Sequence, residues 1–158
     1  MNHWLMKSEP DEISIDDLAR MGAVPWFGVR NYQARNFMRD QMNLGDKVFF
    51  YHSSCPEPGI AGLAEVSAMA FPDAYQFDKK SKYYDAAATQ ENPRWWNVEV
   101  KFVKKTKLLS LQTLRDTPEL EALTILKRGN RLSITPVEKQ HWDFITKRLL
   151  KSVSSVLK

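Results

Sequence analysis

The alternation of apolar and polar residues along the chain predicts five or six β-strands with helices inserted between them. Strands are expected at residues 3–7, 47–53, 60–70, 95–107 and 132–134. The clearest alternation is that of WNVEVKF, which begins at Trp96. In the first strand, Trp4 and Met6 should face one side and Leu5 the other, because successive side chains of a strand point to opposite faces.

Capping signals place helices between these strands. Ser14, with Asp17 three residues later, has the form of a capping box and would start a helix over residues 15–21. Asn31 is a suitable N-cap for a helix over residues 32–42. Three further helices are expected at residues 110–115, at 118–126 after Thr117 as N-cap, and from Pro136 to about Leu150 with Thr135 as N-cap and Glu138 in the first turn.

The order of these elements indicates an α+β fold. Strands and helices do not alternate as βαβ units, which argues against a doubly wound parallel sheet. Curling a sheet of five or six strands into a small barrel would remove its exposed edges. Residues 72–92 are polar and tyrosine-rich and lack a clear period, so we expect a lid or rim with one helical turn. The simplest organisation is one domain over residues 1–150 and a frayed tail over 151–158.

The charge is distributed unevenly along the chain. Residues 1–78 carry 6 Lys and Arg against 11 Asp and Glu, a net charge of −5, and residues 79–158 carry 17 against 8, a net charge of +9. These sum to the net charge of +4. A basic second half is compatible with a polyanionic partner such as nucleic acid, although a solvated lysine-rich surface gives the same pattern.

The composition also indicates in which cellular compartment the protein is expected. No apolar run approaches the roughly 20 residues of a membrane span, and the first residues lack the layout of a secretion signal. The one cysteine, Cys55, excludes an internal disulfide and fits a reducing compartment. We therefore expect a monomer in the cytoplasm, or in the nucleus of a eukaryotic cell, without a membrane partner.

Several catalytic classes are disfavoured by the motifs. His52, Ser53, Ser54 and Cys55 bring a base and nucleophiles together, but neighbours on an extended strand point to opposite faces, which argues against a triad. The three histidines have no metal-ligand spacing, and the six glycines form no phosphate-binding loop. We expect neither catalysis nor a metal or other cofactor.

A binding site for a flat polar molecule agrees better with the residues. Nucleobases are held by stacking on aromatic rings or guanidinium planes and by hydrogen bonds to their edges. Stacking faces could come from Trp26, Tyr32, Tyr51, Trp95 and Trp96, and edge contacts from Ser8, Asn31, Ser53 and Ser54. Phosphate contacts could come from Arg30, Arg35, Lys127, Arg128 and Arg131.

The chain closely resembles the EVE domain family, which comprises relatives of thymocyte nuclear protein within the PUA-like superfamily that also holds the YTH and ASCH domains. The segments that carry the resemblance cover nearly the whole chain in the expected order: Trp4–Pro10 (WLMKSEP), Trp26–Met38, Gly45–Ser54, Asn92–Val100 (NPRWWNVEV) and Leu126–Val137 (LKRGNRLSITPV).

The resemblance implies a PUA-like pseudo-barrel of five or six strands with flanking helices. It also implies a non-catalytic, nucleic-acid-binding module whose pocket reads a modified base, with 5-methylcytosine and its oxidised forms as the candidates. The matching segments assign the pocket to Trp26, Asn31, Tyr32, Ser53 and Ser8, with Lys7 and Ser54 beside them. Two alternatives stay open: an RNA-binding role in tRNA or rRNA handling, and a sensor or enzyme for a small nucleoside-like ligand.

Overall fold

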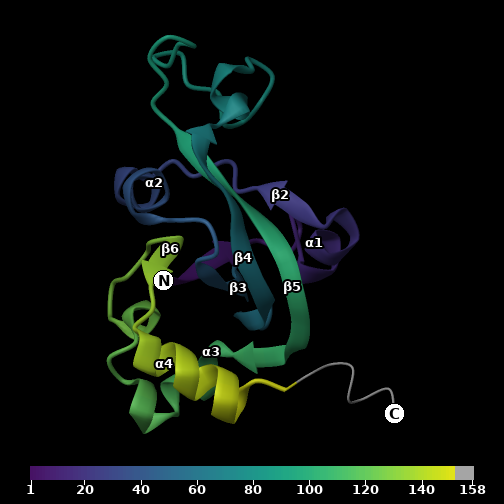
Figure 1. Ribbon diagram of the computed structural model, residues 1–158, viewed down its shortest axis with the longest axis vertical. Coiled ribbons are helices and arrows are strands. Elements are labelled where there is room, and N and C mark those ends of the chain that lie inside the picture. The colour runs from purple at the N-terminus through teal and green to yellow at the C-terminus, as the bar shows by residue number, and fades with distance from the viewer. Residues whose placement is uncertain (152–158) are drawn as a thin grey trace.

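A single mixed β-sheet organises the protein, of which the computed structural model describes residues 1–151 (Figure 1). Its strands are β1 (His3–Ser8), β2 (Ala23–Pro25), β3 (Lys47–His52), β4 (Gly59–Pro72), β5 (Trp96–Ser110) and β6 (Ile134–Pro136). They lie in the order β2-β5-β4-β3-β1-β6, in which β1 and β3 are parallel and every other pair is antiparallel. The predicted α+β, PUA-like fold is confirmed.

The sheet bends without closing. Register shifts interrupt the pairing of β4 with β5 at four points, and such bulges increase the local twist of a strand. Within residues 1–151 the two edge strands, β2 and β6, do not pair with each other. The sheet is therefore a curved, open version of the expected barrel. The sequence analysis missed β2, which is only three residues long.

Helices and turns fill the connections. They are α1 (Ile15–Met21), α2 (Tyr32–Asn36), α3 (Leu111–Arg115), α4 (Lys139–Phe144), the π-helical turns η1 (Phe37–Gln41) and η5 (Ile145–Leu149), and the 3₁₀ turns η2 (Ala74–Phe77), η3 (Pro118–Leu120) and η4 (Thr124–Leu126). The predicted start of α1 is confirmed, because the Ser14 hydroxyl accepts from the Asp17 N–H at 3.1 Å and the Asp17 carboxylate accepts from the Ser14 N–H at 2.9 Å. The predicted Asn31 cap is also confirmed, with its Oδ1 accepting from the Ala34 N–H at 3.0 Å.

Two predicted elements near the C-terminus are wrong. The helix expected at residues 118–126 is replaced by the separate turns η3 and η4. The helix expected to start at Pro136 starts only after Glu138, because Thr135 and Pro136 belong to β6 and pair with β1. The last strand is therefore shifted from 132–134 to Ile134–Pro136. Pairing with the buried strand β1 overrides the local capping signal.

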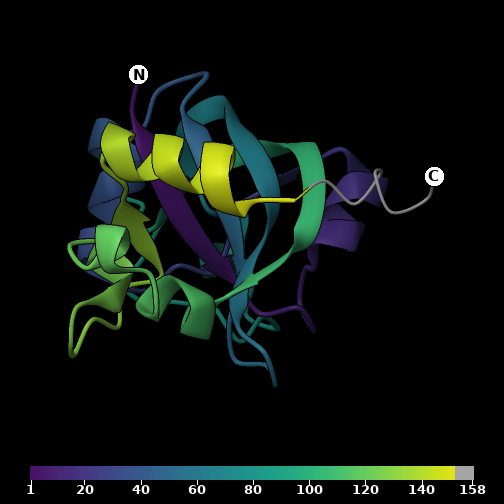
Figure 2. The same cartoon turned by 90° about the horizontal axis from the view of Figure 1, so that it is seen from below.

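Buried apolar side chains form two clusters. Trp4 and Met6 belong to the cluster that α1 and α2 cover, whereas Leu5 belongs to the other, which confirms the predicted alternation. The second cluster contains Trp142 and Ile145, and Figure 2 shows α4 lying across the sheet on this side. Burial of each such side chain contributes about 1.5–3 kcal/mol.

The first residue of the chain is exposed to solvent. The predicted frayed tail lies outside the described residues except for Lys151, whose carbonyl accepts from the Lys107 N–H at 2.9 Å. Within residues 1–151, no helix has the length and apolar character to cross a membrane.

Candidate functional site

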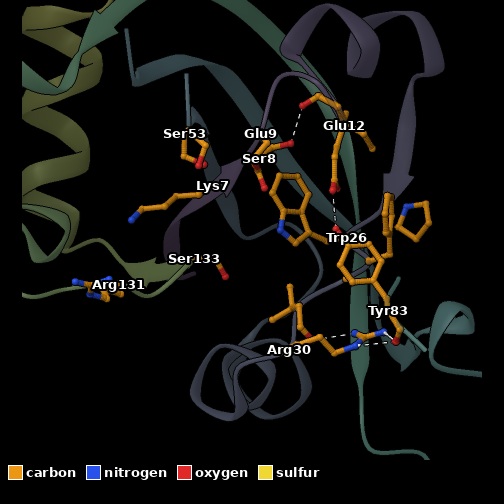
Figure 3. A pocket seen from close by; sticks show the side chains of 16 residues that line it. Lys7, Ser8, Glu9, Glu12, Trp26, Arg30, Ser53, Tyr83, Arg131 and Ser133 are labelled. Carbon is orange, nitrogen blue, oxygen red and sulfur yellow. Dashed lines mark hydrogen bonds between the residues drawn. The ribbon is translucent and has the colours of Figure 1, made fainter. Parts of the chain in front are cut away.

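A cavity of about 360 Å³ lies at the ends of β1 and β3 (Figure 3). Because these two strands are parallel, their carboxyl ends meet at the same edge of the sheet, where Ser8 is paired with His52. The walls come from residues 7–9, 12 and 13 at and after the end of β1, residues 25–30 at and after the end of β2, and Ser53 and Ser54 after β3, with Tyr83, Arg131 and Ser133 completing them. Its volume is in the range of sites for small molecules and single nucleotides.

Trp26 forms the aromatic wall of the cavity. Its backbone N–H donates to the Val98 carbonyl at 2.8 Å, which fixes its position directly after β2. The indole is only 7% exposed and meets the Phe50 ring edge-to-face at 5.5 Å. The side chain thus lies between the core and the cavity and can offer a flat apolar surface to a ligand.

Polar groups gather where β1 and β3 end. The Ser53 N–H donates to the Ser8 carbonyl at 3.0 Å, and the Lys7 N–H donates to the Ser133 carbonyl at 2.8 Å. Ser54 has a left-handed backbone with φ of 53°. Burial lowers the pKa of the Lys7 ammonium below its usual value. This end of the cavity therefore offers hydroxyl groups and one partly desolvated cation.

A bridge joins the two sides of the cavity rim. The Glu12 carboxylate accepts from the Tyr83 hydroxyl at 2.6 Å and pairs with the Lys82 ammonium at 2.6 Å. Hydrogen bonds from Lys82 and then Tyr83 lower the pKa of Glu12. The excursion between β4 and β5 thus reaches the rim through Tyr83, as Figure 3 shows, and its closure as a lid stays a prediction.

Asp73 anchors this excursion to the segment after β2. Its carboxylate, 1% exposed, accepts from the Gly28 N–H at 2.7 Å, from the Tyr75 N–H at 2.8 Å and from the Arg30 guanidinium at 3.0 Å. Arg30 also donates to the Tyr83 carbonyl at 2.8 Å. One buried carboxylate therefore sets the relative position of the aromatic wall and the rim.

Gly28 allows this close packing, and we expect Gly28→Ala to destabilise the protein more than Gly22→Ala. Both glycines have a positive φ, of 81° and 84°, so alanine is strained at either position. A Cβ at Gly28 would lie 2.7 Å from the Tyr83 ring, whereas a Cβ at Gly22 would meet nothing within 4 Å. Urea unfolding of both variants measures the difference, and equal losses would contradict the packing described at Tyr83.

His52 connects the end of β3 to the start of α1. Its Nε2 accepts from the Ile15 N–H at 3.1 Å, which requires an unprotonated Nε2. Burial and, to a smaller extent, Lys105 lower the pKa of His52 below its usual 6.5, against the opposing effect of Asp16. The folded protein thus resists protonation of this imidazole.

We expect the free energy of unfolding to fall as the pH drops from about 6.5 through the folded-state pKa of His52. Below pH 6.5 the unfolded chain takes up a proton that the folded His52 resists, so acid favours unfolding. Urea unfolding between pH 7.5 and 5.5 should show a smaller decline in His52→Gln than in the parent. The pKa of His3 is also lowered mainly by burial, so His3 contributes to the same decline in stability. The decline in His3→Gln is therefore measured alongside that in His52→Gln. An unchanged decline in His52→Gln would refute this role.

The structure brings together seven of the residues singled out from the sequence. The cavity is lined by Lys7, Ser8, Trp26, Arg30, Ser53, Ser54 and Arg131. It is not lined by Asn31, Tyr32, Arg35, Lys127 or Arg128. Of these, Lys127 and Arg128 are exposed on the loop that leads to Arg131.

Tyr32 and Arg35 belong to α2 instead, and Asn31 is its N-cap. The Tyr32 ring, 48% exposed, stacks on Trp95 at 4.9 Å and is covered by the Arg35 guanidinium at 4.7 Å. The side-chain oxygen of Asn31 is occupied by its cap on Ala34. These residues form an outer aromatic and cationic cluster that does not line the cavity.

Among the lining residues with polar side chains, the sequence analysis missed four: Glu9, Glu12, Tyr83 and Ser133. For Tyr83, the only signal in the sequence was the tyrosine-rich composition of residues 72–92. Within residues 1–151, no three His, Cys, Asp or Glu side chains are placed to hold a metal ion.

The chain is similar in sequence and fold to several known proteins. Human thymocyte nuclear protein 1 is 41% identical over 91% of this chain and 72% of its own length. A crystal structure of a Pseudomonas putida protein is 49% identical with a TM-score of 0.88, covering 92% of this chain and 97% of that one. The human THYN1 protein in complex with 5-methylcytosine-containing DNA is 40% identical with a TM-score of 0.86, covering 93% and 96%.

A more distantly related protein has a similar fold, and the EVE family match covers nearly the whole chain. An ASCH protein of Zymomonas mobilis, only 9% identical, has a TM-score of 0.55 and shares the fold alone. Residues 2–148 match the EVE domain. The chain therefore belongs to the EVE domain family.

Proposed function

We propose that this domain binds nucleic acid without catalysis and accepts a modified base, of the 5-methylcytosine type, in the cavity beside Trp26. The observation that carries the proposal is the cavity itself, which Trp26 lines together with several hydroxyl and cationic groups. The similar human protein in complex with 5-methylcytosine-containing DNA supports the choice of ligand.

A concave site suits the recognition of a small substituent better than a flat surface does. Burial of one methyl group contributes only about 0.8 kcal/mol, so an open surface would discriminate weakly. A base must leave the duplex to enter the cavity, which costs a few kcal/mol. Stacking on an aromatic ring returns about 1–3 kcal/mol per base. Hydrogen bonds from the serine hydroxyls would add to this.

Phosphate contacts are assigned to the loop of Lys127, Arg128 and Arg131. All three side chains are exposed to solvent, and Arg131 also lines the cavity. Arg30 and Arg35 are less available. Arg30 makes four hydrogen bonds, to Val29, Asp73 and Tyr83, and so uses four of the five N–H groups of a guanidinium. Arg35 donates to Asn36 and to the Arg94 carbonyl.

Titration with matched oligonucleotides tests this function. Single-stranded and duplex DNA with and without 5-methylcytosine, and a ribose version of the same strand, should be compared at two salt concentrations. We expect the modified DNA to bind tighter and the affinity to fall as salt rises, because phosphate contacts release counterions.

Other outcomes would favour the alternatives. A ribose strand that binds tighter than DNA would favour RNA as the ligand, since only RNA offers the 2′-hydroxyl. A free nucleoside that binds as tightly as any oligonucleotide, with little salt dependence, would favour a small-molecule sensor. The monomeric state and the cytoplasmic or nuclear location stay predictions.

A further inference from the structure

The two ends of the cavity differ in how their cations are used. At the rim, Lys82 pairs with Glu12 and Arg30 pairs with Asp73. At the other end, Lys7 and Arg131 line the cavity, and within residues 1–151 neither side chain forms an ion pair or a hydrogen bond. Figure 3 shows Lys7 and Arg131 on the side of the cavity away from Tyr83. The protein thus keeps two uncompensated positive charges at one end of its cavity.

Hydroxyl groups without partners surround these cations. Ser53, Ser54 and Ser133 line the cavity, and no hydrogen bond of their hydroxyls is found within the described part of the chain. Ser8 differs, since its hydroxyl donates to the Ile13 carbonyl at 2.6 Å. The backbone bonds of Ser53 to Ser8 and of Lys7 to Ser133 hold this end of the cavity in place.

The surroundings of Lys7 offer it no compensating carboxylate. Burial is the sole cause of the lowered pKa of Lys7, without an opposing contribution from an acidic neighbour. Glu9 and Glu12 line the same cavity, but Glu9 does not pair with Lys7 and Glu12 is bound to Lys82 and Tyr83. A partly buried ammonium without a partner is costly, and an anion brought by a ligand would offset that cost.

We propose that Lys7, together with Arg131, Ser53 and Ser133, forms an oxyanion subsite that holds a negatively charged group of the ligand while its base stacks on Trp26. This inference rests on the proposed function. It adds a statement of which part of the ligand binds at the Lys7 and Arg131 end of the cavity. Two groups have this chemistry: a backbone phosphate beside the extruded nucleotide, and a carboxylate carried on the base itself. Ammonium, guanidinium and hydroxyl donors bind either oxyanion.

A cycle of protein and ligand changes tests the subsite. The parent and Lys7→Met are titrated with four oligonucleotides: one with 5-methylcytosine, two in which the phosphate 5′ or 3′ of that base is an uncharged methylphosphonate, and one with 5-carboxylcytosine. Lys104→Met is the control, because Lys104 is an exposed lysine of β5 that does not line the cavity. Thermal unfolding checks that each variant is folded.

The cycle separates the two sources of the oxyanion. If the subsite takes a phosphate, one methylphosphonate should weaken binding to the parent by about 10- to 100-fold and leave Lys7→Met almost unaffected. If it takes a base carboxylate, 5-carboxylcytosine should bind the parent tighter than 5-methylcytosine, and Lys7→Met should lose this preference. Lys104→Met should behave as the parent in both cases. A Lys7→Met variant that binds all four oligonucleotides as the parent does, or loses the same factor for each, would overturn the subsite.

Inorganic phosphate gives a readout that does not depend on oligonucleotide binding. Because a ligand of the folded state raises the unfolding temperature, phosphate should stabilise the parent and Lys104→Met more than Lys7→Met, against a chloride control of equal ionic strength. No difference between these proteins would count against the subsite. A parent that binds no oligonucleotide, or binds modified and unmodified DNA equally, would instead refute the proposed function.

Discussion

Replacement of Asp73 by asparagine is expected to lower the free energy of unfolding by about 3 kcal/mol, the range for breaking a buried charged contact. One carboxylate oxygen accepts from both Gly28 and Arg30, and the other accepts from the Tyr75 N–H. An amide has only one oxygen, so in either orientation its NH₂ group faces a donor. The Arg30 guanidinium would also lose the one carboxylate that it pairs with among residues 1–151. Urea unfolding at neutral pH measures the effect.

A surface aspartate provides the control for this substitution. Asp40 pairs with Arg39 at 2.8 Å but is exposed to solvent, so Asp40→Asn should change stability little. The double variant Arg30→Met with Asp73→Asn should be less destabilised than the sum of its parts, since the two residues share one contact. A loss in Asp73→Asn no greater than that in Asp40→Asn would contradict the anchoring role of Asp73.

The second large effect concerns ligand binding, where Trp26→Ala is expected to weaken binding of DNA containing the modified base by about 10- to 100-fold. This range corresponds to the roughly 1–3 kcal/mol that stacking of one base contributes. Because Trp26 also packs on Phe50, the variant should be less stable by about 3 kcal/mol. Binding is therefore measured at a temperature where circular dichroism shows it folded, with Trp26→Phe as a milder variant of intermediate affinity.

Two other aromatic residues sharpen this measurement. Phe71 is exposed on β4 and does not line the cavity, so Phe71→Ala should bind as the parent does. Tyr32→Ala distinguishes the cavity from the outer cluster on α2. If Tyr32→Ala loses binding while Trp26→Ala keeps it, the base stacks on the outer cluster and the cavity is not the base pocket.

The sequence predicts well those elements whose signals are local. The capping box of Ser14 and Asp17 starts α1 at the expected residue, because its hydrogen bonds join residues only three apart. The alternation of Trp4, Leu5 and Met6 correctly assigns them to opposite faces, because a buried strand leaves no other arrangement.

Elements that depend on distant partners are predicted poorly. Thr135 and Pro136 carry a good helix-start signal, yet they pair with β1, about 130 residues earlier in the chain, a contact that no local pattern reveals. For the same reason the bridge of Glu12 to Tyr83 escaped prediction, since 71 residues separate the two side chains.

Asn31 shows how one residue can carry two competing predictions. Its sequence position predicts an N-cap, and the resemblance assigns it to the pocket. The cap is confirmed and uses its side-chain oxygen, and the residue lies outside the cavity. The local hydrogen bond thus accounts for Asn31 without a ligand, whereas Trp26, placed by its position after β2, does line the cavity.

The position of β1 inside the sheet has a consequence for synthesis on the ribosome. Of the six strands of this sheet β1 emerges first, but its neighbour β3 begins 44 residues after it, and its other neighbour, β6, begins only at Ile134. Until then one edge of an apolar strand stays unpaired, which favours association with other chains. Chains interrupted before Ile134 would therefore present an aggregation-prone edge and become targets for chaperones or proteases, and the sheet can be completed only when almost the whole domain has been made.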